Sequence, residues 1–168
     1  TDIPALYGAW FRNRLKAGFA SSINPYNGKS YEVSLDPKKI DGFVFWTRNA
    51  SSFGPVLADL QKIPLPFIVQ YTITGYPRFL DRYVPHAKKM ISVFKQISSD
   101  FGQDSIVWRY DPIVWTTKTD FNFHLENFSR LAEALYGFTN EVVLSFVHHY
   151  AKTRRNLDRA ARLYDFEW

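Results

Sequence analysis

The sequence predicts an α/β fold in which the strands of a parallel sheet alternate with helices. Apolar, strand-like runs and amphipathic helical segments alternate along the chain. Polar residues recur at the ends of successive strands, which is where α/β proteins bind their ligands. No glycine-rich turn follows a strand, so the dinucleotide-binding signature of open doubly wound sheets is missing. We therefore expect a parallel sheet of the TIM-barrel type.

Length and composition indicate one folded domain that spans residues 1–168. Hydrophobic residues make up 46% of the chain and aromatic residues 18%, which excludes a disordered protein. A full barrel takes about 250 residues, so we expect a partial barrel in a fragment of a longer protein. No apolar run approaches the roughly 20 residues that span a bilayer. We expect a cytoplasmic protein without a membrane partner, and no oligomeric state is predicted.

The amino-terminal segment predicts a helix and then a hairpin. Asp2 is typical of a helix N-cap and Pro4 of a first turn. Apolar residues follow at helical spacing up to about Lys16, and Gly18 ends the pattern. Turn signals within residues 19–35 predict an irregular strand and hairpin.

Four strands and four helices are predicted in alternation after the hairpin. The strand-like runs are residues 43–46, 67–72, 106–111 and 142–147. The segments with helical spacing of apolar residues are 54–61, 85–101, 123–136 and 152–164. Strands joined by helical crossovers run parallel, so their carboxyl ends meet at one edge of the sheet.

The most informative motif is the run Trp-Arg-Tyr-Asp-Pro at residues 108–112. In a strand, residues two apart point to the same face, so Arg109 and Asp111 share one face while Trp108 and Tyr110 share the other. The proline is expected to end the strand. A charged pair at the carboxyl end of an interior strand indicates a ligand site, or else an ion pair that only stabilises the strand end.

Polar residues at the other strand ends complete the predicted site. The planar guanidinium of Arg109 suits a carboxylate or a phosphate, and Asp111 could hold it or act as a ligand or base. Arg48 could add a second guanidinium, while Asp2 could reach the site or only cap its helix. The predicted catalytic residues are Asp111, Arg109 and Asp2, and the predicted substrate- or cofactor-binding residues are Arg48, Asn49, Gln70, Thr72 and Ser145.

No metal site is predicted. Cysteine is absent, so the chain itself offers no disulfide, no thiolate nucleophile and no cysteine ligand. His148 and His149 are adjacent in sequence, so their side chains diverge and cannot chelate one metal together, although one of them could transfer a proton. His86 and His124 fall at predicted helix starts, where we expect surface positions.

The net charge of +5 is concentrated in two basic clusters. They comprise Arg12, Arg14 and Lys16, and Lys152, Arg154, Arg155, Arg159 and Arg162. Such clusters bind phosphate-rich partners such as nucleic acids, or they are simply solvated helix faces. We expect a small-molecule or anionic substrate, with nucleic acid as the alternative partner.

Several phrases of the sequence together resemble the bacterial family named domain of unknown function 1848. They are Thr-Asp-Ile-Pro-Ala at residues 1–5, Phe-Val-Phe-Trp-Thr-Arg-Asn at 43–49, Tyr-Thr-Ile-Thr-Gly-Tyr-Pro at 71–77, Trp-Arg-Tyr-Asp-Pro-Ile at 108–113, Ser-Phe-Val at 145–147 and Lys-Thr-Arg-Arg-Asn at 152–156. The resemblance spans almost the whole chain. It implies a partial barrel whose mouth would be lined by Asp2, Arg48, Asn49, Arg109 and Asp111.

The resemblance also implies a cofactor class. Members of the family are labelled DNA repair photolyase-like and resemble radical S-adenosylmethionine enzymes. In them two arginines precede the Thr-Asp-Ile-Pro motif, and a cysteine-rich segment suited to an iron–sulfur cluster follows; this sequence has neither. Cluster ligation needs thiolates, so this chain alone binds no such cofactor, whereas a 4Fe-4S cluster and S-adenosylmethionine are implied for the full-length protein. The alternatives are a cluster-free barrel that binds an anionic small molecule and a nucleic-acid-binding protein.

Overall fold

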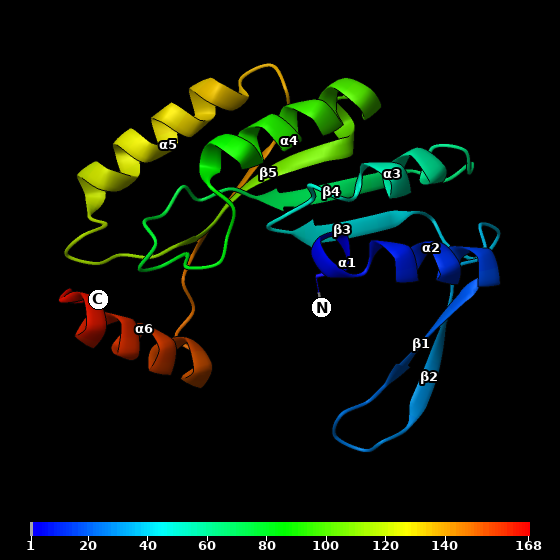
Figure 1. Ribbon diagram of the computed structural model, residues 1–168, viewed down its shortest axis with the longest axis horizontal. Coiled ribbons are helices and arrows are strands. Elements are labelled where there is room, and N and C mark those ends of the chain that lie inside the picture. The colour runs from blue at the N-terminus through cyan, green and yellow to red at the C-terminus, as the bar shows by residue number, and fades with distance from the viewer. Residues whose placement is uncertain (1) are drawn as a thin grey trace.

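The computed structural model describes residues 2–168 and contains an open, four-stranded parallel sheet (Figure 1). The strands are β3 (Phe43–Thr47), β4 (Phe67–Thr72), β5 (Ile106–Ile113) and β6 (Val142–Phe146), and they lie in this order. Each pairs in parallel with the next, which is the order of successive strands in a barrel. The sheet does not close within residues 2–168. The predicted α/β fold with a partial, barrel-like parallel sheet is thus confirmed.

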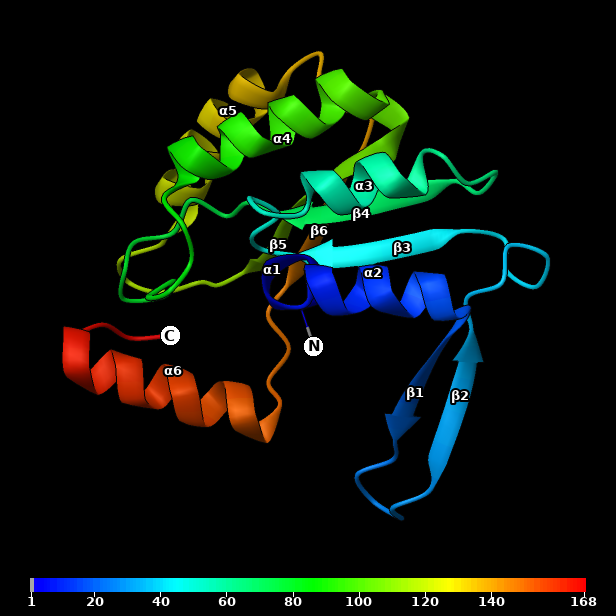
Figure 2. The same cartoon turned by 45° about the vertical axis from the view of Figure 1, so that its right-hand side comes forward.

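Two helices precede the strands, and from β3 onward helices and strands alternate. The helices are α1 (Ile3–Leu6), α2 (Gly8–Ala17), α3 (Gly54–Leu60), α4 (Ala87–Phe101), α5 (Phe121–Leu135) and α6 (Ala151–Tyr164), with a short 3-10 helix at Gln103–Ser105. The strands β1 (Phe19–Ile23) and β2 (Ser30–Ser34) form an antiparallel hairpin that projects away from the sheet (Figures 1 and 2). In the described residues no helix is long and apolar enough to cross a membrane.

The hydrophobic core lies on one face of the sheet. Both views place α3, α4 and α5 on the same side of the strands (Figures 1 and 2). Buried side chains from these helices, such as Leu57, Phe94 and Leu131, meet buried side chains of the strands, such as Phe45 and Val69. Phe11 of α2 joins the same core, because its ring packs edge-on against Phe45 at 5.3 Å between centroids. Burial of these apolar surfaces is the main driving force for the fold.

The opposite face of the sheet is much less covered. Along β3, Phe45 is buried in the core, whereas Val44 and Trp46 on the other face are 56% and 65% exposed. The same alternation places Gln70 of β4 and Arg109 of β5 on the face of Trp46. We call this side the open face. In a closed barrel the corresponding face lines the interior.

Two predicted boundaries are wrong. The first helix was expected to be continuous up to Lys16, but it breaks at Tyr7 into α1 and α2. The Asp2 carboxylate ties α1 to the end of β3, while α2 packs through Phe11 on the core, and a single straight helix does not meet both demands.

The proline at position 112 does not end β5, which continues to Ile113. Proline has no N–H to donate, so the pairing with β6 is interrupted there. It resumes one step later, where Ile113 lies opposite Phe146. The extra residue forms an irregularity of the β-bulge type, which re-aims side chains next to functional sites. This irregularity lies beside Asp111.

Helix α6 does not join the helix layer. After β6 the chain turns away, and α6 stands apart from α5 in both views (Figures 1 and 2). A groove of about 660 Å³ is lined by residues of α6, by residues 79–84 and by Arg48. The last helix therefore lies near the carboxyl ends of the strands rather than beside the sheet.

Candidate functional site

Four of the predicted residues form one hydrogen-bonded group on the open face, which we call the strand-end cluster: Gln70, Arg109, Asp111 and Ser145. Arg109 forms an ion pair with Asp111 through Nη2 and Oδ2. Its Nη1 donates to Gln70 Oε1 of β4 at 3.3 Å. The hydroxyl of Ser145 on β6 donates to Asp111 Oδ1. Three neighbouring strands thus hold one guanidinium and one carboxylate, each on a side chain that is 21% exposed.

The environment of Asp111 favours its ionised form. Burial alone would raise the pKa of Asp111. The hydrogen bonds from Ser145 and Arg109, together with the positive charges of Arg109 and Arg48, outweigh that effect and lower the pKa below its ordinary value. At neutral pH this side chain is therefore a hydrogen-bond acceptor and a weak base, and it has no proton to donate.

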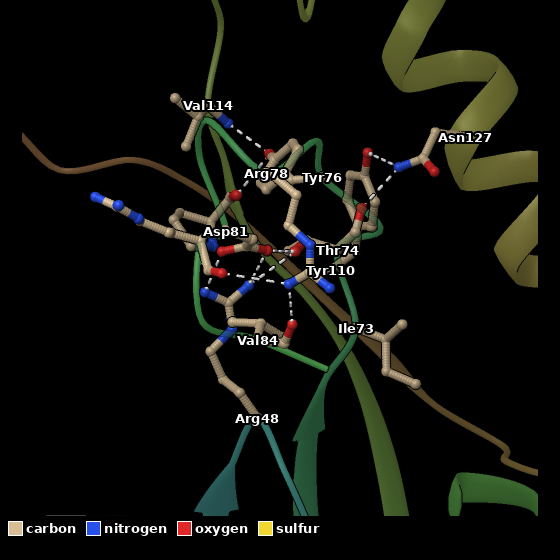
Figure 3. Close-up of polar contacts among 12 residues, drawn as sticks. Arg48, Ile73, Thr74, Tyr76, Arg78, Asp81, Val84, Tyr110, Val114 and Asn127 are labelled. Carbon is tan, nitrogen blue, oxygen red and sulfur yellow. Dashed lines mark hydrogen bonds and ion pairs between the residues drawn. The ribbon is translucent and has the colours of Figure 1, made fainter. Parts of the chain in front are cut away.

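Arg48 has an aspartate partner of its own. It lies just past β3, and its Nη1 and Nη2 donate to the two carboxylate oxygens of Asp81 at 2.7 and 2.6 Å (Figure 3). Thr74 adds two bonds, because its hydroxyl accepts from Arg48 Nη2 at 2.8 Å and donates to Asp81 Oδ2 at 2.7 Å. Asp81 and Thr74 are both buried. The two arginines therefore do not share one acid: Arg48 holds the loop after β4, while Arg109 stays in the strand-end cluster.

Asp2 joins the first helix to the end of β3. Its Oδ1 caps α1 by accepting from Ala5 N at 3.0 Å and also accepts from the hydroxyl of Thr47 at 2.8 Å. Its Oδ2 accepts from Arg48 N at 3.3 Å. Both carboxylate oxygens thus accept hydrogen bonds from the protein itself, so Asp2 has a structural role next to the site.

The remaining two predicted residues lie apart from these hydrogen bonds. Asn49 closes a local turn, because its Oδ1 accepts from Ser51 N at 3.1 Å. Thr72 is buried on the open face, opposite Arg109 in the pairing of β4 with β5. It lies beside the strand-end cluster without taking part in its hydrogen bonds.

A buried polar chain behind β5 was not foreseen, and the expectation that His124 lies at the surface is wrong. His124 is 8% exposed. Its Nε2 lies 3.1 Å from the carbonyl oxygen of Val114, which can only accept, so Nε2 carries the proton. In the neutral imidazole Nδ1 then accepts from the hydroxyl of Tyr110 at 2.8 Å. Asn127 Nδ2 donates to the same hydroxyl at 3.0 Å and to Thr74 O at 2.7 Å. Burial raises the pKa of Tyr110, which keeps the phenol neutral.

Tyr76 fastens the loop after β4 to the end of β5. Its hydroxyl donates to Pro112 O at 2.8 Å and accepts from Val114 N at 2.8 Å (Figure 3). Burial raises the pKa of Tyr76, so this phenol also stays neutral. The loop that carries Thr74 and Asp81 is thereby held against the strand that carries Arg109.

The sequence contains a weak signal for some of these unforeseen residues. Thr74 and Tyr76 belong to the phrase at residues 71–77 that supports the family resemblance. Asp81 gave no signal, since a lone acidic residue in a loop does not reveal its partner. The burial of His124 could not be predicted from its position at a helix start, because that position does not reveal the aromatic side chains that cover it. One of them is Trp115, whose ring stacks on His124 at 5.9 Å between centroids.

No metal-binding group is present in residues 2–168. His148 packs its ring against Tyr150 at 4.7 Å, and His149 stacks on Trp168 at 5.3 Å. The two imidazoles thus have different neighbours, as expected from their adjacency.

Comparison with known proteins gives one match. A family model described as "Domain of unknown function (DUF1848)" matches residues 1–167, essentially the whole chain. No curated protein and no solved structure matches the chain.

The lowered pKa of Asp111 predicts a specific pH dependence of stability. Its contribution should be fully present above the unfolded-state pKa of about 3.9 and lost as the pH falls through the lower pKa of the folded state. Asp111→Asn should therefore lower the free energy of unfolding by about 1–3 kcal/mol at pH 7, and its difference from the wild type should shrink below about pH 4. Urea unfolding from pH 2.5 to 7 measures both, with the exposed Asp41→Asn as control. A pH-independent difference would contradict the assignment.

The two roles of Asp2 predict that it matters more than an ordinary cap. Asp120 caps α5 through a 2.9 Å bond to Phe123 N and provides a matched comparison. Asp120→Ala should cost about 1 kcal/mol, whereas Asp2→Ala also loses the bonds to Thr47 and Arg48 and should cost about 2 kcal/mol or more. Chemical denaturation measures both costs, and equal costs would show that the bonds to β3 contribute nothing.

Proposed function

The chain belongs to the DUF1848 family, and from that premise we propose that residues 1–168 bind a small hydroxylated carboxylate at the carboxyl ends of the parallel strands. The family description names no activity, so the proposal depends on the site. In α/β folds ligands bind at this edge of the sheet. The strand-end cluster lies there and on the open face, where a ligand can reach it.

The observation that carries the proposal is that three strands converge on Arg109. A guanidinium offers five N–H donors, and the bonds to Asp111 and Gln70 use one on Nη2 and one on Nη1. These two partners fix the position of the guanidinium. The Arg109 side chain is 21% exposed, so its other N–H groups are accessible from the open face. A guanidinium binds a carboxylate through two parallel hydrogen bonds.

Asp111 indicates the second part of the ligand. A carboxylate held in its ionised form repels another anion but accepts a hydrogen bond from a hydroxyl. The hydroxyl of Ser145 lies against it and can accept in turn. Trp46 pairs with Gln70 across β3 and β4 and is 65% exposed on the same face, so its indole provides an apolar surface beside the polar groups. This combination suits a small molecule with a carboxylate, a hydroxyl group and a short carbon chain.

The resemblance to radical S-adenosylmethionine enzymes supports a place for this site within an enzyme. Such chemistry needs an iron–sulfur cluster held by thiolates. The sequence has no cysteine, and the described residues contain no other metal-binding group, so residues 1–168 do not fit that cofactor. We therefore assign to these residues the binding and orientation of the substrate, and no reaction step through a cluster is derived. Arg109 and Asp111 are the proposed substrate-contacting residues.

A second candidate function is nucleic-acid binding through α6. Its five cations, Lys152, Arg154, Arg155, Arg159 and Arg162, are all exposed. None of them forms an ion pair with a carboxylate in the part of the chain that the structure describes. Charge that is not neutralised along one helix is the feature that attracts a phosphate backbone.

The main proposal predicts a selective loss of ligand binding. L-Malate carries the carboxylate and hydroxyl groups that the site should recognise, whereas succinate lacks the hydroxyl. Isothermal titration should show tighter binding of L-malate than of succinate. Arg109→Gln should weaken L-malate binding by about tenfold or more, because it removes a charge-assisted, two-bond contact. The L-malate affinity of Arg109→Lys should lie between those of the wild type and Arg109→Gln, since lysine keeps the charge but lacks the two-pronged guanidinium.

The control for that experiment is Arg12→Gln. Arg12 is an arginine of α2 that pairs with Asp59 at 2.6 Å, in the helix layer and outside the strand-end cluster. Its replacement should leave L-malate binding unchanged. Equal binding by the wild type and Arg109→Gln, or no preference for L-malate over succinate, would overturn the proposed ligand class.

The second candidate predicts affinity that depends steeply on salt. Fluorescence anisotropy with a 20-nucleotide single-stranded DNA measures the slope of log affinity against log salt concentration. Neutralising Arg154, Arg155 and Arg159 together as glutamines should reduce that slope by about 2, at roughly 0.7 for each phosphate contact on a single strand. An unchanged slope in the triple variant would exclude α6 as the binding surface.

A further inference from the structure

A separate cavity lies outside the strand-end cluster and contains none of the predicted site residues. It measures about 210 Å³ and is enclosed by the loop after β4, the start of α4 and the side of α5. The lining residues used below are Thr74, Gly75, Arg78, Asp81, Ala87 and Arg130. We call it the α4–α5 cavity.

Arg78 is held at this cavity by backbone carbonyl groups. Its Nη1 donates to Val84 O at 2.6 Å and to Arg82 O at 3.3 Å (Figure 3). Both acceptors are neutral, so they fix the position of the guanidinium without cancelling its charge. The side chain is exposed, which leaves its other donors accessible to a ligand.

Arg130 is held in the same way from α5. Its Nη2 donates to Asn127 Oδ1 at 2.7 Å, and Asn127 is itself 7% exposed and fixed by bonds to Thr74 O and the hydroxyl of Tyr110. The backbone at Gly75 lies so close that a Cβ there would come within 2.7 Å of Asn127 Oδ1. A neutral, buried amide thus orients the second guanidinium, which is also exposed.

The positive charge of this pair is not neutralised by the protein. Neither Arg78 nor Arg130 forms an ion pair with a carboxylate within residues 2–168. Asp81 also lines the cavity, but its two oxygens are bound to Arg48 at 2.7 and 2.6 Å and one also accepts from Thr74. The Arg48–Asp81 pair is neutral as a unit, so Arg78 and Arg130 give the lining of the cavity a net positive charge.

We propose that the α4–α5 cavity binds a phosphate group, either free or as a phosphate ester. A phosphate dianion matches two guanidiniums in charge, and its tetrahedral oxygens can face both walls, whereas a carboxylate has one charge and two oxygens in a plane. Because both arginines are already oriented by neutral partners, less side-chain entropy is lost when the anion binds. This inference is independent of the ligand proposed for the strand-end cluster.

Inorganic phosphate is the probe for the test. The full chain is titrated with phosphate by calorimetry and by ¹⁵N-resolved NMR, at an ionic strength held constant with sodium chloride. Saturable binding is expected, with the largest shifts at the backbone amides of Gly75 and Ala87. Arg130→Gln and Arg78→Gln should each weaken binding by about tenfold or more. Arg12→Gln and Arg109→Gln should bind phosphate as the wild type does.

Several outcomes separate this inference from its alternatives. Arg78 also holds its loop, so thermal unfolding of each variant is measured alongside, and Arg130→Gln decides the question if Arg78→Gln does not fold. The proposal is overturned if Arg130→Gln binds phosphate normally, if chloride alone produces the same shifts, or if only Arg109→Gln loses phosphate binding. If the wild-type protein binds phosphate but does not bind L-malate, only the proposed function is contradicted.

A titration with glycerol 3-phosphate identifies the source of the anion. Tighter binding than that of inorganic phosphate supports a phosphate ester whose carbon chain also contacts the protein. Equal affinity for the two, lost together in Arg130→Gln, supports a site for free phosphate. No binding of either compound overturns the proposal.

Discussion

The alternation of side chains along β5 is the constraint on which the rest of the site depends. On one face Trp108 is buried and donates through its indole N–H to Ile73 O at 2.9 Å, and Tyr110 enters the buried chain with His124. Because successive residues point to opposite faces, these buried bonds leave Arg109 and Asp111 only the open face. The aromatic core thus fixes the position of the charged pair. A shift of one residue in the pairing of β5 would turn the two aromatic side chains to the open face and the charged pair into the core.

The loop after β4 is the second element that orders the site. It is fastened to β5 by Tyr76, to α5 by the bond from Asn127 to Thr74 O, and to the end of β3 by the Arg48–Asp81 pair. These anchors come from three different elements, so the loop cannot move without breaking buried or charge-assisted hydrogen bonds, which are costly to leave unmade. Binding groups supported in this way are held in place before a ligand arrives.

The sequence predicted those parts of the molecule that local rules govern. Hydrophobic periodicity located the helices and strands, and alternation within a strand brought Arg109 and Asp111 to one face, with Gln70 and Ser145 on the neighbouring strands beside them. The parts that depend on contacts between distant residues were missed. No residue near Asp81 in the sequence indicates that it pairs with Arg48, which lies 33 residues away. The break at Tyr7 likewise follows from two packing demands made by different parts of the fold, and helical spacing alone does not reveal it.

The two arginine sites differ in how their charge is balanced, and this difference separates their chemistry. Arg109 is paired with Asp111, so the strand-end cluster is neutral as a unit and a ligand is selected there by its pattern of hydrogen bonds. Arg78 and Arg130 are oriented by carbonyl and amide oxygens, so the α4–α5 cavity attracts a ligand by its charge. Salt screens the attraction between free charges more strongly than a pattern of short hydrogen bonds. Binding at the cavity should therefore weaken steeply with ionic strength, while binding at the cluster should change little, which gives each site its own signature in one protein.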